Sequence, residues 1–232
     1  MARVLITRAQ SQADATAALV KARGFDPLVF PLTQTEVLKD GVRAVEAHAR
    51  GVMVATSARA IEVLEGAGLG LWIGEQHWAV VGTRAAAHLT KLHAKLIMPP
   101  AHDVAGLIEG LKGQHTRLTY LAGADRKQAL EAAFPAMQVI PVYQANALGG
   151  FSADAVQRLS AEPPAFVLVY SHRGAHLLRQ AIDDAGLQTD MKQMQWLCLS
   201  QDVAAEAPSK AAVRIADVPT QDALLRLLAH SH

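Results

Sequence analysis

Cysteine is nearly absent from this sequence. The chain has 232 residues and one cysteine, Cys198, which lies in the apolar run Trp196–Leu199. A single cysteine excludes an intramolecular disulfide and a thiolate metal cage. Because its neighbours are apolar, we interpret Cys198 as a buried strand residue rather than as a nucleophile.

An excess of charge and a long apolar run are also missing. The chain has 22 basic and 21 acidic residues, so it has no overall field that would recruit nucleic acid or an anionic membrane. No apolar run approaches the roughly 18 residues needed to span a bilayer, and the N-terminus enters an apolar strand pattern at once. We therefore predict a cytoplasmic protein without nucleic-acid or membrane partners, in which local groups bind any anionic ligand.

Several common motifs are absent. The glycines of residues 66–70 follow a helical stretch, where they are expected to end the helix, and residues 122–127 lack the spacing of a phosphate-binding loop. His172 and His176 are four residues apart, but no HExxH motif or carboxylate accompanies them. The sequence has no Gly-x-Ser-x-Gly elbow. These observations argue against a nucleotide enzyme, a metal site and a serine hydrolase.

Short apolar runs alternate with longer stretches of helical period. This pattern predicts an α/β fold whose parallel sheets are covered on both faces. The first helix is expected over residues 11–23, with Ser11 as its N-cap and Gly24 as its end. The expected strands are Val4–Ile6, Leu28–Phe30, Val52–Ala55, Trp78–Val81, Leu96–Met98, Leu118–Leu121, Val139–Ile140, Phe166–Tyr170, Trp196–Leu199 and Val213–Ala216.

The two halves of the chain resemble each other. The run 52–57 followed by Arg59 matches 167–171 followed by Arg173, and the run 78–82 matches 196–200. The strand expected at 4–7 similarly matches 118–121, and that at 96–98 matches 213–216. A unit repeated over half the chain predicts two similar sheets of about five strands rather than one of about ten.

Two proline-centred segments, 29–35 and 139–145, share one order of apolar, proline and polar residues. Proline favours an extended backbone for itself and for its predecessor. The segments could pair as a connector between two domains, or each could end its own sheet. The first possibility makes one domain discontinuous, whereas the second allows a consecutive split near residue 116, and the pattern leaves both open.

Small residues, hydroxyl groups and arginines recur where the expected strands end. In open parallel sheets this edge binds ligands, and the helix N-termini there attract anions. Ser57 and Ser171 are also plausible N-caps without any other role. The candidate binding residues at these ends are Thr7, Arg8, Ser57, Ala58, Arg59, Gly82, Thr83, Gly123, Arg126, Ser171 and His172.

Tyr143 is the candidate catalytic residue. Its phenol follows Pro141 in the second proline-centred segment, and a hydrogen-bonded phenol can donate a proton to a leaving hydroxyl group. A tyrosine in a strand also commonly serves packing alone.

Taken together, these segments resemble the uroporphyrinogen-III synthase family over nearly the whole chain. The resemblance is carried by the order and spacing of residues 4–8, 30–32, 56–60, 80–82 and 142–144, of Ser171 with Gly174, and of 219–220 followed by 223–224.

The resemblance implies two flavodoxin-like domains of parallel sheet joined by a two-stranded β connector. The first would comprise residues 1–33 and 147–232, the second 37–142, and the connector 30–36 and 140–147. It also implies a cofactor-free and metal-free cyclisation of the linear tetrapyrrole hydroxymethylbilane in the cleft between the domains. A spiro intermediate inverts ring D, water is lost, and uroporphyrinogen III forms. Tyr143 matches the tyrosine thought to assist departure of the hydroxyl group.

The substrate implied by the family carries eight carboxylates, which suits helix N-termini and scattered arginines. A monomer is expected, with a possible transient contact to hydroxymethylbilane synthase, the enzyme that supplies the substrate. Two positions depart from the family pattern: Ala85 stands where many members have threonine, and Asp202 lies in a turn that is rich in glycine and threonine in relatives. The alternative function is a non-catalytic two-lobed protein of the same fold that binds a small anion or a tetrapyrrole.

Overall fold

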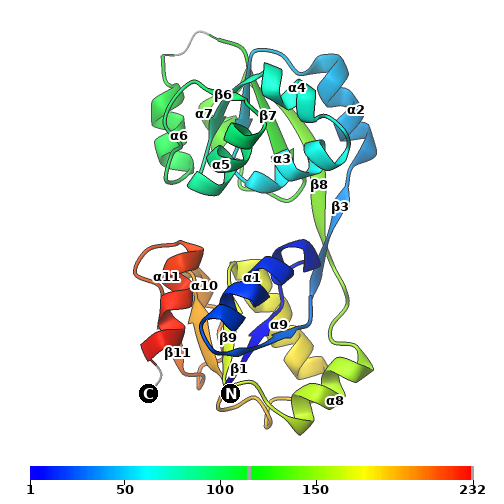
Figure 1. The fold of residues 1–232 in the computed structure, drawn as a ribbon, viewed down its shortest axis with the longest axis vertical. Coiled ribbons are helices and arrows are strands. Elements are labelled where there is room, and N and C mark those ends of the chain that lie inside the picture. The colour runs from blue at the N-terminus through cyan, green and yellow to red at the C-terminus, as the bar shows by residue number, and fades with distance from the viewer. Residues whose placement is uncertain (114–115, 231–232) are drawn as a thin grey trace. The chain divides into compact units, whose positions relative to one another are not determined.

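The structure is a computed structural model, and it describes residues 1–113 and 116–230. It divides into two compact units, here called unit 1 (residues 1–34 and 146–232) and unit 2 (residues 35–145). Unit 2 is therefore an insertion between the two segments of unit 1, as the colours of Figure 1 make clear.

Unit 1 has a five-stranded sheet in the order β11-β10-β9-β1-β2, in which every pair is parallel. Its strands are β1 (Arg3–Ile6), β2 (Asp26–Val29), β9 (Phe166–Val169), β10 (Gln195–Cys198) and β11 (Val213–Ile215). Its helices are α1 (Gln10–Ala22), α8 (Ala153–Ala161), α9 (His172–Asp184), α10 (Gln201–Ala204), α11 (Gln221–Arg226) and a 3₁₀ turn (Leu227–His230).

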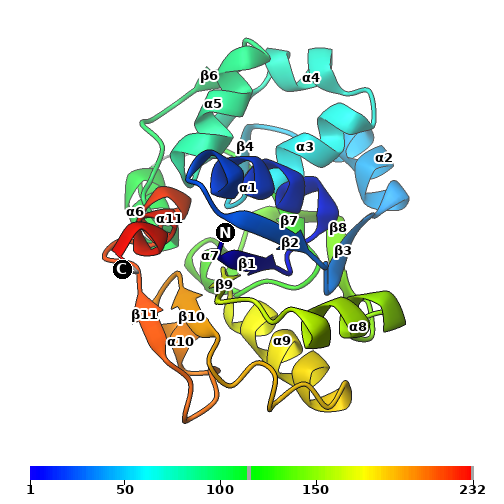
Figure 2. The same ribbon diagram turned by 60° about the horizontal axis from the view of Figure 1, so that its bottom comes forward.

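Alternate residues of β1 pack on opposite faces of this sheet. Val4 and Ile6 share a buried cluster with residues of α1 and α11, whereas Leu5 packs with residues of α8 and α9. Figure 2 shows α8 and α9 on the side of the sheet away from α1. Because both faces are covered, β1 is apolar at successive positions instead of alternating with polar residues.

Unit 2 has a six-stranded sheet in the order β3-β8-β7-β4-β5-β6. Its strands are β3 (Thr33–Val37), β4 (Val52–Ala55), β5 (His77–Val80), β6 (Lys95–Leu96), β7 (Leu118–Gly123) and β8 (Gln138–Ala147). Its helices are α2 (Lys39–His48), α3 (Ala58–Gly66), α4 (Gly70–Glu75), α5 (Thr83–Lys91), α6 (Val104–Leu111) and α7 (Ala129–Ala133). One core cluster packs under α2–α5, and a second packs under α6 and α7.

The internal repeat is visible in the strand order. Without β3, the sheet of unit 2 reads β8-β7-β4-β5-β6, and that of unit 1 reads β2-β1-β9-β10-β11 from its other end. Each strand takes the place of its counterpart in the sequence repeat. All ten expected strands are present, so the predicted α/β fold with two mostly parallel sheets is confirmed.

The second proline-centred segment lies within β8, and the first runs from the end of β2 to the start of β3, the strand that pairs with β8. The backbone amide of Leu38 donates to the carbonyl of Val142 over 3.0 Å, and that of Leu148 donates to Leu32 over 3.0 Å. In these two contacts the higher residue number on the side of β3 is joined to the lower one on the side of β8, so the two strands are antiparallel. Figure 1 shows them side by side.

The start of the first helix differs from the prediction. Helix α1 begins at Gln10, and its N-cap position is Ala9, which has no side-chain cap. The carbonyl of Ala9 accepts the amides of Gln12 and Ala13, so Ser11 lies inside the first turn and is not the N-cap. The predicted end is right, because Gly24 follows the helix with a φ of 82°. None of the helices in the described part of the chain has the length and hydropathy that a bilayer crossing requires.

Candidate active site

Three neighbouring strands of unit 2 bring the candidate catalytic residue together with two candidate binding residues. Tyr143 lies on β8, Gly123 ends β7, and Ser57 follows β4, and these strands are adjacent in the sheet. The register of β7 and β8 shifts next to Tyr143: Ala122 pairs with Pro141, and Gly123 pairs with Tyr143. This irregularity places the phenol beside the carboxyl end of β7.

Gly123 allows the ring of Tyr143 to lie against the backbone of β7. A Cβ atom at position 123 would be 3.0 Å from Cε2 and Cζ of Tyr143 and 3.1 Å from its hydroxyl oxygen. Such distances are shorter than ordinary van der Waals contact between carbon atoms. On the other side of the same turn, the amide of Ala124 donates to the carbonyl of Tyr143 over 2.8 Å.

Ser57 has two roles at this edge. It is the N-cap of α3, where its Oγ accepts the amide of Arg59 over 3.2 Å, and its side chain is near enough to the phenol of Tyr143 to lower the pKa of that phenol. The guanidinium of Arg59 is buried, with 7% of the residue exposed, and lies 3.6 Å from Glu62. Glu62 also pairs with Arg84 over 2.7 Å. The predicted anion-binding arginine is therefore part of an ion-pair network behind the phenol.

The surroundings of Tyr143 keep its proton in place. Burial raises the pKa of the phenol, while the hydrogen bond to Ser57 and the charge of Arg59 lower it and the charge of Glu62 raises it. The net change is upward from the ordinary value of about 10. The group is protonated at neutral pH and can act as a hydrogen-bond and proton donor.

A more deeply buried phenol lies near that of Tyr143. Tyr120, on β7, is 3% exposed, and its hydroxyl lies 2.8 Å from Oγ1 of Thr56. Burial raises the pKa of Tyr120, the hydrogen bond to Thr56 lowers it, and the nearby Tyr143 raises it further. Sequence reasoning did not single out this residue, because Tyr120 occupies one position of a continuously buried strand.

Other candidate residues of unit 2 have structural partners. Arg126 pairs with Glu131 over 2.7 Å and donates to the carbonyls of Gly123 and Ala124 over 3.2 and 3.1 Å. It therefore fixes the turn beside Tyr143. Gly82 is the N-cap of α5 with a φ of 84°, and its amide already donates to Ala101 over 2.8 Å.

The remaining positions of this edge lie on two helices. Thr83 is the first residue of α5, and Ala58 is the first residue of α3. Ala85, one of the two departures from the family pattern, is fully buried in the core cluster under α5. A hydroxyl group at position 85 would have to be satisfied inside that cluster.

Unit 1 has its own group of candidate residues. Arg8 follows β1, and its guanidinium carbon lies 3.9 Å from the centre of the Tyr170 ring. Arg8 also donates to Gln12, Thr16 and Gln221 over 3.1 to 3.3 Å. The neighbouring Thr7 is largely buried. Stacking and neutral oxygens hold this guanidinium at the carboxyl edge of the sheet.

Ser171 and His172 begin α9 at the same edge. Ser171 caps the helix by accepting the amide of Gly174 over 3.0 Å. His172 lies 3.6 Å from Glu206, a carboxylate that also contacts His176 over 3.2 Å. Glu206 is distant in sequence, so the pattern around His172 and His176 did not reveal this carboxylate partner. In the part of the chain that the structure describes, no group of three or more possible ligands could hold a metal ion.

Most of the chain matches one protein family. The family model described as Uroporphyrinogen-III synthase HemD matches residues 14–226. The chain belongs to the uroporphyrinogen-III synthase family. As a member, it is a lyase of heme biosynthesis that converts hydroxymethylbilane into uroporphyrinogen III.

A solved structure agrees with this fold. The chain is similar to a mutant uroporphyrinogen III synthase from the extremely thermophilic bacterium Thermus thermophilus, with a TM-score of 0.60, 18% identity, and coverage of 99% of this chain and 96% of that chain. For the wild-type protein from the same bacterium, in another crystal form, the TM-score is 0.47 and the identity is 18%, with coverage of 98% of this chain and 96% of that chain. No curated protein sequence matches the chain.

Proposed function

We propose that this chain closes hydroxymethylbilane to uroporphyrinogen III with inversion of ring D, and that Tyr143 is the general acid of the reaction. The observation that carries the proposal is the placement of a protonated phenol at the carboxyl edge of a parallel sheet, beside Gly123 and Ser57. Ligands bind at this edge in open α/β sheets.

The proposed reaction begins at the terminal hydroxymethyl group. Its carbon–oxygen bond breaks while the phenol of Tyr143 donates a proton, and the hydroxyl leaves as water. The resulting azafulvene cation reacts with the substituted carbon of ring D and forms a spiro-pyrrolenine. This intermediate fragments and closes again with ring D inverted. The proton that ring D releases as it becomes aromatic again restores the phenol.

Positioning contributes much of the catalysis in this proposal. The azafulvene reacts readily, so holding ring D near the cation favours the spiro route over simple closure. We propose that the eight substrate carboxylates contact the helix N-termini and polar side chains at the carboxyl edges. The starts of α3 and α9 and the side chain of Arg8 support this assignment. Thr7, Ala58, Arg59, Gly82, Thr83, Arg126 and His172 stay predicted contacts.

A comparison of two phenols tests the role of Tyr143. Tyr143→Phe removes the proposed acid, so we expect the rate of uroporphyrinogen III formation to fall by about 10²-fold or more while some type III product still forms. Freshly made hydroxymethylbilane is the substrate, and chromatography separates the type I and type III isomers.

Tyr120→Phe is the matched control, because it also removes one buried hydroxyl from the same edge. We expect a loss of stability from the broken contact to Thr56 and a smaller loss of rate. If the two variants lose the same rate, or if Tyr120→Phe is the slower enzyme, Tyr143 is not the acid. If the unmodified protein leaves only the type I isomer, the cyclisation itself is refuted, and the non-catalytic binding protein becomes the better assignment.

Organisation and location are further proposals. We propose that the two compact units are two domains and that the connector segments 30–36 and 140–147 join them. The predictions of a cytoplasmic monomer, without nucleic-acid or membrane partners and with a transient contact to hydroxymethylbilane synthase, stay predictions. Light scattering at several protein concentrations measures the oligomeric state.

A further inference from the structure

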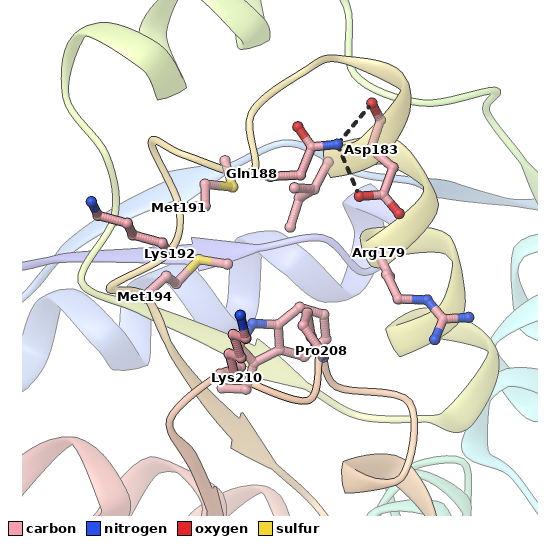
Figure 3. Close-up of a pocket in the computed structure, with 11 residues that line it drawn as sticks. Arg179, Asp183, Gln188, Met191, Lys192, Met194, Pro208 and Lys210 are labelled. Atoms are coloured by element: carbon pink, nitrogen blue, oxygen red, sulfur yellow. Dashed lines mark hydrogen bonds between the residues drawn. The ribbon is translucent and has the colours of Figure 1, made fainter.

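A pocket of about 310 Å³ lies in unit 1. It is bounded by the C-terminal part of α9, the segment that precedes β10, and the turn that precedes β11 (Figure 3). Trp196 is the second residue of β10, so the pocket is at the amino edge of the sheet. Ser171 and His172 follow β9 at the opposite, carboxyl edge.

The inner wall of the pocket is apolar. Ile182, Met191, Met194 and Trp196 line it, and each is less than a tenth exposed. Methionine side chains adapt to irregular ligands and make favourable contacts with aromatic rings. This wall suits a flat apolar group, and the volume is at the lower end of the roughly 300–1,000 Å³ typical of small-molecule sites.

The rim of the pocket is basic. Arg179, Lys192 and Lys210 line it with a single carboxylate, Asp183, which gives a formal charge of +2. Figure 3 shows that the three basic residues come from three different segments. Asp183 accepts a hydrogen bond from Gln188 over 3.1 Å.

The two lysines are the cations that a ligand can reach. Arg179 pairs with Glu206 over 3.3 Å. Across residues 1–113 and 116–230, Lys192 and Lys210 have no ion-pair partner. Both lysines are exposed, and both line the pocket.

We propose that this pocket binds a small organic anion that has an apolar body of one or two rings. The rings contact the wall formed by Met191, Met194 and Trp196, and the carboxylate or other anionic group lies between Lys192 and Lys210. The linear tetrapyrrole with its eight carboxylates is too large for this volume, so the site is separate from the one that performs cyclisation. The proposal does not depend on the catalytic role of Tyr143.

Methionine methyl resonances test the proposal in the full-length protein. The chain has six methionines, of which Met191 and Met194 line the pocket and Met53 and Met137 belong to the cores of unit 2. With ¹³C-methyl methionine labelling, titration with 2-naphthoate is expected to shift the Met191 and Met194 resonances to saturation and to leave those of Met53 and Met137 in place.

Two comparisons separate this proposal from simple apolar adsorption. The double variant Lys192→Ala/Lys210→Ala is expected to weaken naphthoate binding by about tenfold, because charge-assisted contacts are lost. The neutral alcohol 2-naphthalenemethanol is expected to bind the unmodified protein correspondingly more weakly. The proposal is overturned if millimolar naphthoate leaves Met191 and Met194 unshifted. It is equally overturned if the alcohol binds as tightly as naphthoate, or if the double variant keeps full affinity with unchanged Met53 and Met137 resonances.

Discussion

At the scale of single residues, the fold raises the pKa of every tyrosine side chain. Tyr120, Tyr143 and Tyr170 are its only tyrosines, and burial is the largest cause of a raised pKa for each. Arg8 counteracts the effect of burial at Tyr170, as Arg59 does at Tyr143. Both halves of the repeat therefore place an arginine near a partly buried phenol.

Alkaline titration checks these environments. The unfolded phenols have a pKa of about 10, and the folded values are higher, so the folded state retains protons to a higher pH. The stability that this difference provides is fully present below about pH 10 and is lost as the pH rises through the folded pKa values. We expect phenolate absorbance to appear at a higher pH in the folded protein than in urea. Coincident curves would contradict the raised pKa values.

A single methyl group at position 123 tests the packing of Tyr143. In Gly123→Ala, the new Cβ would crowd the ring at 3.0 Å, so the phenol must move by a few tenths of an ångström. We expect a lower cyclisation rate with a small change in stability, measured by isomer analysis and thermal unfolding. Gly66→Ala is the matched control, because a Cβ there meets nothing within 4 Å. Equal rates in the two variants would mean that the position of the ring does not limit catalysis.

At the scale of elements, helix caps connect stability with the site. Ser57 caps α3 and also lies near the phenol of Tyr143, whereas Ser152 caps α8 by accepting the amide of Ala155 over 3.2 Å. Replacing either serine by alanine should cost about 1 kcal/mol of stability. Only Ser57→Ala should also slow cyclisation, because the phenol of Tyr143 loses the neighbouring hydroxyl that lowers its pKa. Denaturant unfolding and initial rates measure the two effects, and an equally slow Ser152→Ala enzyme would show that lost stability alone explains the rate.

Elements were more predictable than the contacts between them. Apolar runs located the ten expected strands, most directly β4, β7 and β9, which are buried at every position and therefore apolar at nearly every one. The predicted start of α1 was wrong, because the carbonyl of Ala9 accepts the amides of Gln12 and Ala13 and no side chain caps the helix. The pairing of Tyr120 with Thr56 and the contact of Glu206 with His172 join residues that are far apart in sequence, so no local pattern reveals them. Glu62 was within reach of sequence reasoning, three residues after Arg59 on one helix.

At the scale of the whole molecule, each of the four core clusters lies within one unit. Two clusters draw all their buried residues from unit 1, and the other two draw theirs from unit 2. Cys198 is a probe of unfolding in unit 1. It is fully buried in β10, and burial raises the pKa of its thiol to about 11. Labelling of this thiol at neutral pH therefore requires unit 1 to open.

Because the cores of the two units are separate, we expect each unit to unfold without the other. Leu64→Ala removes a fully buried side chain from a core of unit 2 and should destabilise that unit by about 2–5 kcal/mol. We expect the labelling rate of Cys198 to stay unchanged in this variant. Leu168→Ala, in a core of unit 1, is the matched control and should accelerate labelling strongly. If Leu64→Ala accelerates the reaction of Cys198 as much as Leu168→Ala does, the units open together, and the connector strands transmit unfolding from one core to the other.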